Sequence, residues 1–435
     1  MFDSYEERRQ KLNMKRVARL ALVLSMALLL LALPLFGACV PEEEEEEPGP
    51  VGPTKTTVLL GAFVGLTGPA AEDCTGYWEG YVDYVKWINE EEGGIEVNGV
   101  KYKIDFRYWD SGYTIPRALT LLKKAVDEEI PLLILNSQGE EEALKPMVAK
   151  EEIPVITGSI GEALASPPGW IYGITPGYPA GFGLGIDWIV ENWAETRAPN
   201  IGFLTWDVAF GRAILTDECL AYAEEKGVNI VGTEFLPSMP LDLSPQLLKL
   251  KDAGADYIFG NYTEPQTSLL VRQAHELGVT PGAKLFGSVW AFNPGTVRLV
   301  GAEACEGYMG TMDIPWWTDD TPGVKLMKEM RHKYRPDAPE WTFQYPKGIV
   351  LIEAAREILR RTIEAVGIDN VTGANVKKHG IDAMKNYKDP NGFLPEVTFS
   401  ADDIVGVKKL RIGIMEGGEC IVSDWKPVPP LGWGR

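Results

Sequence analysis

Hydrophobic residues along this chain follow two alternating patterns, one typical of strands and one typical of helices. Residues 58–64 form a short, largely apolar run, and residues 77–89 then carry apolar side chains at helical spacing. The alternation continues with strands expected at 102–109, 132–135 and 154–156 and helices expected at 115–129 and 140–151. Asn98-Gly99, between two short apolar runs, predicts a two-residue hairpin. Short apolar runs that alternate with helices of about 10–15 residues indicate βαβ units and parallel sheets.

A second series of the same kind follows residues 175–177. Its expected helices are 180–193, 212–226, 244–253, 265–277 and 294–300, and its expected strands are 201–205, 228–233, 257–259, 284–286 and 307–312. Ser244 is expected to be a helix N-cap, with Pro245 at the first helical position. The two series predict two similar α/β lobes with parallel sheets. In open sheets of this kind the ligand lies beyond the carboxyl ends of the strands.

The N-terminal part of the chain has a different pattern. Three basic residues precede an apolar run at 20–35, and two small residues lead into Cys39. The run is shorter than the roughly 20 residues that cross a bilayer, so it indicates a cleaved secretory signal over residues 1–38. Met1 and Met14 both remain candidates for the first residue. The small pair before Cys39 resembles the lipobox of bacterial lipoproteins, which implies lipid on Cys39. An ordinary cleaved signal with an incidental cysteine is the alternative, because Phe36 stands where the lipobox usually has Leu.

Residues 39–56 are expected to be an acidic tether. Residues 42–47 are six consecutive glutamates, with prolines and glycines on both sides. Charge repulsion and proline keep such a segment extended. The whole chain has a net charge of −20. This charge argues against a nucleic-acid partner, because a phosphate-binding surface needs clustered Lys and Arg.

No residue pattern predicts a catalytic, metal or cofactor site. Ser159 lies in a sequence that resembles a nucleophile elbow, but Thr157 stands where that motif needs glycine. The three histidines fall in separate helical segments, and no phosphate-binding glycine loop is present. No Cys/His spacing suits zinc. An exported location permits disulfides, but the sequence does not choose a pairing among Cys74, Cys219, Cys305 and Cys420.

Residues 65–99 resemble the opening of type I periplasmic binding proteins of the branched-chain amino acid transporter group. In that group a strand leads to a Gly-Pro loop, a helix, an Asn, a Gly-Gly-Ile turn and a second Gly. The matching residues are Gly68-Pro69, Asn89, Gly93-Gly94-Ile95 and Gly99. The resemblance continues through Asp110 and residues 136–138, 153–161, 208–214 and 397–415, and it ends near Trp425.

This resemblance implies an α/β fold of two Rossmann-like lobes that close about a hinge of three crossing segments. The crossings are expected near residues 173–176, 312–317 and 390–395. The first lobe would comprise residues 57–174 and 314–392. The second lobe would comprise residues 175–313 and 393–426, with a tail at 427–435.

The resemblance also implies the ligand-binding residues. The ligand's carboxylate would be held by Ser137 or Gln138 and by Ser159 with Gly161. Phe210 supplies the aromatic ring of the second lobe. Asn261, Tyr262 and Trp290 would add further contacts.

Two positions depart from the family pattern. Asp73 stands where the family has its first-loop aromatic residue, and Val289-Trp290 replaces the carboxylate that binds the ligand's amine. A buried ammonium without a carboxylate is costly. Either Asp73 takes over that role or the ligand has no free amine. A solvated loop position for Asp73 is the remaining alternative.

The expected function follows from the resemblance together with the leader. The chain would be a lipid-anchored solute-binding protein outside the cytoplasm, and it would deliver a small molecule to an ABC permease. An amino-acid-like compound, an amide and an aromatic carboxylate are the candidate ligands. We expect a monomer without cofactor, metal or catalytic residues. A ligand-sensing ectodomain that serves a separate signalling protein is the alternative, and an enzyme is the third hypothesis.

Overall fold

The computed structural model describes residues 55–432, except 238, 265 and 340–341. The predicted signal, Cys39 and nearly all of the predicted tether lie outside these residues. In the described part of the chain, no helix is both long and apolar enough to cross a membrane.

The first sheet has six strands in the order β2-β3-β1-β4-β5-β6. Every pair is parallel except the hairpin of β2 and β3. Asn98 and Gly99 form the hairpin turn with positive φ angles of 50° and 80°, so the predicted hairpin is confirmed. The strands are β1 (Thr57–Val64), β2 (Ile95–Val97), β3 (Val100–Asp110), β4 (Leu133–Ile134), β5 (Val155–Thr157) and β6 (Ile171–Gly173).

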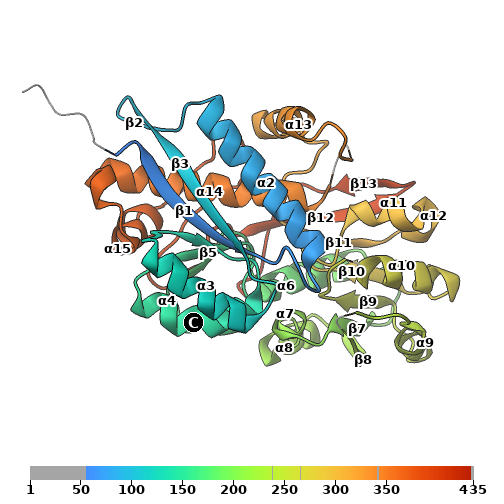
Figure 1. The fold of residues 1–435 in the computed structure, drawn as a ribbon. Helices are drawn as coiled ribbons and strands as arrows, with labels where there is room; N and C mark the ends of the chain where they lie inside the picture. The colour runs from blue at the N-terminus through green and yellow to red at the C-terminus, as the bar shows by residue number, and fades with distance from the viewer. Residues whose placement is uncertain (1–54, 238, 265, 340–341, 433–435) are drawn as a thin grey trace, which may run out of the picture. The chain divides into compact units, whose positions relative to one another are not determined.

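Two long helices, α2 and α14, pack against each other beside this sheet (Figure 1). They approach closely because each has a glycine at the contact. A side chain at Gly80 would strike the backbone carbonyl of Tyr345, and one at Gly348 would strike that of Tyr77. The helices of this lobe are α2 (Ala71–Glu90), α3 (Ile115–Asp127), α4 (Gln138–Lys150), α5 (Glu162–Ala165), α13 (Pro322–Tyr334), α14 (Gln344–Val366), η2 (Ile368–Asn370), α15 (Gly373–Asn375) and η3 (Val376–Ile381).

The second sheet has the order β13-β12-β11-β10-β9-β7-β8, with β14 beside β12. Strands β7 to β11 are parallel, and β12 and β13 run antiparallel at one edge. The predicted α/β class with two largely parallel sheets is confirmed. The strands are β7 (Asn200–Trp206), β8 (Asn229–Leu236), β9 (Tyr257–Gly260), β10 (Lys284–Gly287), β11 (Met309–Met312), β12 (Lys409–Glu416), β13 (Glu419–Val422) and β14 (Lys426–Pro427).

Two predicted helices of the second lobe differ from the structure. The helix expected at 212–226 begins only at Asp217, after a separate short helix that ends at Arg212, and the Thr216 side chain caps it by accepting the Cys219 N–H at 3.3 Å. Ser244 is the first residue of its helix and not its N-cap. Its N–H and hydroxyl both donate to the Asp242 carboxylate, at 2.9 and 2.6 Å. The helices are α6 (Tyr178–Glu191), α7 (Ala209–Arg212), α8 (Asp217–Glu225), α9 (Ser244–Asp252), α10 (Gln266–Glu276), η1 (Pro294–Thr296), α11 (Val297–Val300) and α12 (Ala302–Cys305).

The third crossing between the sheets lies later in the chain than predicted. The Gly406 N–H donates to the Gly173 carbonyl at 2.8 Å and the Val407 N–H to the Ile174 carbonyl at 2.9 Å, so residues 405–407 run beside the first crossing. Residues 390–395 instead pack on the first lobe. Phe393 lies edge-on to Tyr84 of α2, with ring centroids 5.6 Å apart.

Candidate functional site

A small cavity lies where strands of both sheets end, and we call it the aromatic cavity. Its space is about 10 Å³, roughly the room that one water molecule needs, so the two lobes are closed on each other. Each lining residue belongs to a segment that follows a strand. The first lobe contributes Ala70, Cys74, Tyr113, Asn136 and Gln138, and the second contributes Tyr178, Phe210, Thr263 and Trp290.

Aromatic rings from both lobes meet at Trp290. Its ring stacks on Tyr77 of α2, with centroids 4.9 Å apart and planes at 10°. It also lies edge-on to Phe210 at 6.3 Å, and Phe210 lies edge-on to Tyr178 at 5.0 Å. Such pairs contribute about 0.5–1.5 kcal/mol each beyond the area they bury. They stabilise the closed arrangement, and a ligand that enters must replace some of these contacts.

Asn136 brings an unsatisfied polar group to the cavity. Its side chain is buried, and within the described part of the chain neither the amide oxygen nor the amide nitrogen has a hydrogen-bond partner. A buried polar group without a partner costs about 1–3 kcal/mol. A ligand with one donor and one acceptor would remove this cost. Asn136 was not among the predicted site residues, although the loop that contains it was.

Two of the predicted carboxylate-binding residues contact each other at the edge of the cavity. The Gly161 N–H donates to the Gln138 side-chain oxygen at 3.0 Å, and the Gln138 amide nitrogen donates to Glu142 at 2.6 Å. Gln138 lines the cavity, whereas Ser137 is buried beside it as the residue before α4. Gln138 and Gly161 are therefore held together before any ligand binds.

Ser159 lies in a buried polar chain that leads toward the crossing segments. Its hydroxyl is 3.1 Å from that of Thr175, which donates to Asp313 at 3.0 Å. Asp313 forms an ion pair with Lys347 of α14, with 2.9 Å between the Asp313 Oδ1 and Lys347 Nζ atoms. Both partners of this pair are almost fully buried, and burial lowers the pKa of Lys347.

The Lys347 ammonium lies behind the aromatic cavity. It donates to the Val289 carbonyl and lies 4.9 Å from the centroid of the Trp290 ring. Sequence reasoning missed this ion pair. Asp313 follows strand β11 directly, which is a detectable signal, but Lys347 sits inside a 23-residue helix with nothing to distinguish it.

Asp73 joins the two lobes without lining the cavity. It lies in the first turn of α2 and is fully buried, so the alternative of a solvated loop residue is wrong. Its carboxylate accepts the Glu264 N–H of the second lobe at 3.0 Å and a bond from the Gln344 amide. Burial and the nearby Glu264 charge raise the pKa of Asp73 to about 8.

Asn261 and Tyr262 are buried behind the cavity wall. The Asn261 side chain donates to the Phe210 carbonyl at 3.0 Å and so fixes the loop that carries this ring. The Tyr262 hydroxyl is buried and has no partner among the described residues. Neither side chain lines the cavity as the structure has it.

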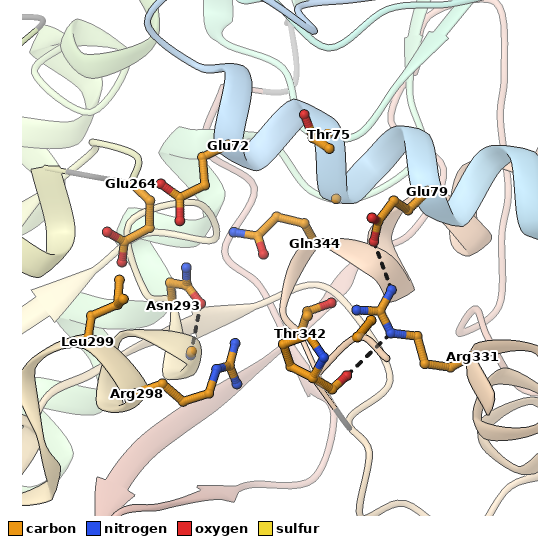
Figure 2. Close-up of a pocket in the computed structure, with 14 residues that line it drawn as sticks. Glu72, Thr75, Glu79, Glu264, Asn293, Arg298, Leu299, Arg331, Thr342 and Gln344 are labelled. Carbon is orange, nitrogen blue, oxygen red and sulfur yellow. Dashed lines mark hydrogen bonds and ion pairs between the residues drawn. The ribbon is translucent and has the colours of Figure 1, made fainter. Parts of the chain in front are cut away.

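A larger pocket of about 270 Å³ lies nearby, and we call it the charged pocket (Figure 2). Glu79 and Arg331 form an ion pair at 2.8 Å across it, and the Asn293 side chain accepts the Gly295 N–H at 2.9 Å. Its lining residues are Glu72, Thr75, Gly76, Glu79, Glu264, Asn293, Gly295, Arg298, Leu299, Arg331, Ala338, Pro339, Thr342 and Gln344.

The described residues contain no group of His, Cys, Asp and Glu side chains arranged to hold a metal ion. Cys74, Cys219, Cys305 and Cys420 are all buried free thiols, so none of the disulfide pairings left open by the sequence is present among them.

Comparison with known proteins gives matches over most of the folded part. A family model described as periplasmic binding protein matches residues 57–419. Leu/Ile/Val-binding protein homolog 7 of Brucella melitensis is 25% identical over 223 residues, which are 46% of this chain and 54% of that protein. The chain thus spans about half the length of the curated relatives it matches.

Solved structures match over a larger share of the chain. The structure of a branched chain amino acid ABC transporter from Thermus thermophilus with bound valine has a TM-score of 0.75 and 25% identity, and the match covers 86% of this chain and 97% of that one. An ABC transporter substrate binding protein of Aeropyrum pernix has a TM-score of 0.76 at 19% identity, over 87% of this chain and 97% of that one. The second match supports the fold alone.

Proposed function

Because the chain belongs to the periplasmic binding protein family, we propose that it is a solute-binding protein of an ABC importer outside the cytoplasm. Its two lobes close on a small organic molecule and carry it to a membrane permease without covalent chemistry. The observation that supports this most is the aromatic cavity at the strand ends, where the buried Asn136 amide has no partner among the residues that the structure describes. The candidate ligands are an amino-acid-like compound, an amide and an aromatic carboxylate.

The contacts around Trp290 suggest how ligand capture works. In the closed lobes its ring stacks on Tyr77, which lies on the opposite lobe, so ring contacts fill the space that a ligand would take. Opening about the crossing segments separates these rings. A flat or branched apolar group can then replace one ring contact while Asn136 and Gln138 bind the polar end. Closure on the ligand restores the burial, which is the hinge mechanism of two-lobed binding proteins.

A thermal-shift screen of the full chain against amino acids, amides and aromatic acids tests this function. A ligand at a hundredfold excess over its Kd stabilises the folded state by about 2.7 kcal/mol. Phe210→Ala should abolish the shift, whereas Leu241→Ala, at a site that is 94% exposed, should keep it. A shift that survives Phe210→Ala would contradict the proposed site.

The lipid anchor on Cys39 belongs to the same proposal and has its own test. Cys39→Ser should move the protein from the membrane fraction to the soluble extract. If the unaltered protein never enters the membrane fraction, the lipid anchor is wrong while the ligand-binding function stands.

A further inference from the structure

Carboxyl groups outnumber ammonium groups in the buried shell around the aromatic cavity. Five carboxyl side chains and one lysine there are each at most 4% exposed: Asp73, Glu140, Glu141, Glu264, Asp313 and Lys347. Acidic side chains are rarely buried unless a cation pairs with them. The Lys347 ammonium is already paired with Asp313 at 2.9 Å. None of the other four carboxyl groups has a buried lysine partner within the described part of the chain.

Three of these carboxyl groups act on residues that line the cavity. Asp73 precedes Cys74 in α2, and Glu140 and Glu141 lie in the first turn of α4, which begins with Gln138. Burial raises the pKa of Tyr113 and of Cys74, and nearby carboxylate charges raise both further: Glu140 and Glu141 at Tyr113, and Asp73 and Glu140 at Cys74. Neither oxygen of Glu140 makes a hydrogen bond of normal geometry to a described residue. Glu141 accepts one bond, from the Thr157 hydroxyl at 2.8 Å. Each of these groups, when ionised, makes the electrostatic potential in the cavity more negative.

The cavity wall complements this negative potential. Four of its nine lining residues are aromatic: Tyr113, Tyr178, Phe210 and Trp290. The face of an aromatic ring attracts cations, and alkylated ammonium groups bind in cages of such rings. An apolar wall with buried carboxyl groups behind it suits a cation that is bulky and weakly hydrated.

We propose that the ligand carries an alkylated ammonium group, which sits among these rings and is balanced by the buried carboxyl groups of the first lobe. The inference rests on the proposed solute-binding function and names its ligand class. Asn136 would bind a polar group elsewhere on the same molecule. The carboxylate that balances the cation then comes from the first lobe, and Val289-Trp290 of the second lobe contributes ring and backbone only.

The proposal predicts how ligand binding depends on pH. Without a cation, burial raises the pKa of Glu140 to about 7 and that of Glu141 to about 8. A bound cation favours the ionised carboxylates, so binding releases protons and affinity rises as the pH increases from about 6 to 8. The charged and polar groups that face these carboxyls are Asp110, Ser111, Thr114, Arg117, Glu142 and Thr157 around Glu140 and Glu141, and Glu72, Cys74, Glu264, Gln344 and Lys347 around Asp73.

Calorimetric titration of the full chain tests the ligand class. The probes are choline, glycine betaine, benzoate, valine and the uncharged analogue of choline in which carbon replaces nitrogen. We expect choline or glycine betaine to bind, and the better of them to bind at least about tenfold more tightly than the uncharged analogue. Titrations in two buffers of different protonation enthalpy should show proton release on binding.

Matched variants separate this inference from the proposed function. Glu140→Gln should weaken cation binding about tenfold, and Glu303→Gln, whose side chain is 91% exposed, should leave it unchanged. Phe210→Leu is a second test of cation binding, because it removes one of the four rings and keeps the core apolar. Binding of benzoate or valine alone would overturn the cation inference and leave the proposed function intact. Equal affinity for choline and its uncharged analogue would also overturn the cation inference, as would proton uptake on binding. If none of the probes binds, the result counts against both the cation inference and the proposed function.

Discussion

The aromatic cavity and the charged pocket use neighbouring residues of the same helix, yet they differ in whether their polar groups have partners. Cys74 of α2 faces the cavity, and Thr75 and Glu79 face the charged pocket (Figure 2). In the larger pocket Glu79 pairs with Arg331, and the Thr342 hydroxyl lacks a partner among the described residues. In the cavity both ends of the Asn136 amide lack one within the same part of the chain. An amide with both ends unsatisfied, and not volume, is therefore the feature on which the proposal for the aromatic cavity rests.

Loss of the buried Lys347 charge behind the cavity should have the largest effect on the free energy of unfolding. Lys347→Met leaves Asp313 buried without its cation and should lower the free energy of unfolding by about 3–5 kcal/mol. Lys325→Met, which removes an exposed ion pair with Asp320, should change it by less than about 1 kcal/mol. Chemical denaturation measures both. Similar losses in the two variants would show that the cavity's charges are no more critical than surface charges.

Asp73 should make the stability of the folded chain depend on pH. Its pKa in the fold is raised to about 8 from an ordinary 3.8, so the folded state keeps a proton that the unfolded chain loses. Stability from this group is complete below about pH 4 and is lost as the pH rises toward 8, by up to about 1.4 kcal/mol per unit. Between pH 5 and 7 this loss is about 2–3 kcal/mol.

Asp73→Asn should remove that loss, because the Gln344 amide can turn to accept from the new Asn. Denaturation curves at several pH values measure the effect, with Glu72→Gln, an exposed neighbour in the same helical turn, as the control. Parallel pH profiles for the unaltered chain and Asp73→Asn would contradict the assignment.

The aromatic rings of the cavity should matter for ligand affinity, and the side chains of the charged pocket should not. Trp290→Ala is expected to weaken the binding of the best ligand by about 2 kcal/mol, which is a roughly thirtyfold loss of affinity. Leu299→Ala in the charged pocket should leave the affinity within about twofold, because this side chain is 64% exposed. If a titration shows a larger loss of affinity for Leu299→Ala than for Trp290→Ala, the ligand binds in the charged pocket and the proposed site is wrong.

The two asparagines provide the sharpest test of unsatisfied against satisfied groups, although the effects are smaller. Asn136→Leu removes a buried amide without partners, so it should stabilise the ligand-free chain by about 1 kcal/mol. Asn293→Leu removes the cap of η1 and should destabilise the ligand-free chain by about 1 kcal/mol. Shifts of the same sign in the two melting temperatures would remove the distinction between the pockets.

The order of strands and helices could be predicted from the sequence because the spacing of apolar residues decides it locally. The loops at the strand ends followed from that order, and the family resemblance then implied Gln138, Phe210 and Trp290 within them. Asn136 was missed by one position, because whether a side chain at a strand end points inward depends on a one-residue register. No local pattern reports that register.

The buried charges could not be predicted because packing between segments far apart in the sequence brings them together. Lys347 and Asp313 are 34 positions apart and meet only when α14 packs beside a crossing segment. Asp73 was correctly singled out as unusual, but its contacts with Glu264 and Gln344 span 191 and 271 positions. The hydrophobic pattern of α14 gives no signal for a lysine at its buried face.

A crystal structure with the best-binding compound from the thermal-shift screen or the titrations tests the central claim most directly. The account predicts the compound between the lobes in an enlarged aromatic cavity, against Trp290 and Phe210 and within hydrogen-bond distance of Asn136. A compound bound among Glu72, Arg298 and Thr342 in the charged pocket, with the aromatic cavity unchanged, would contradict it.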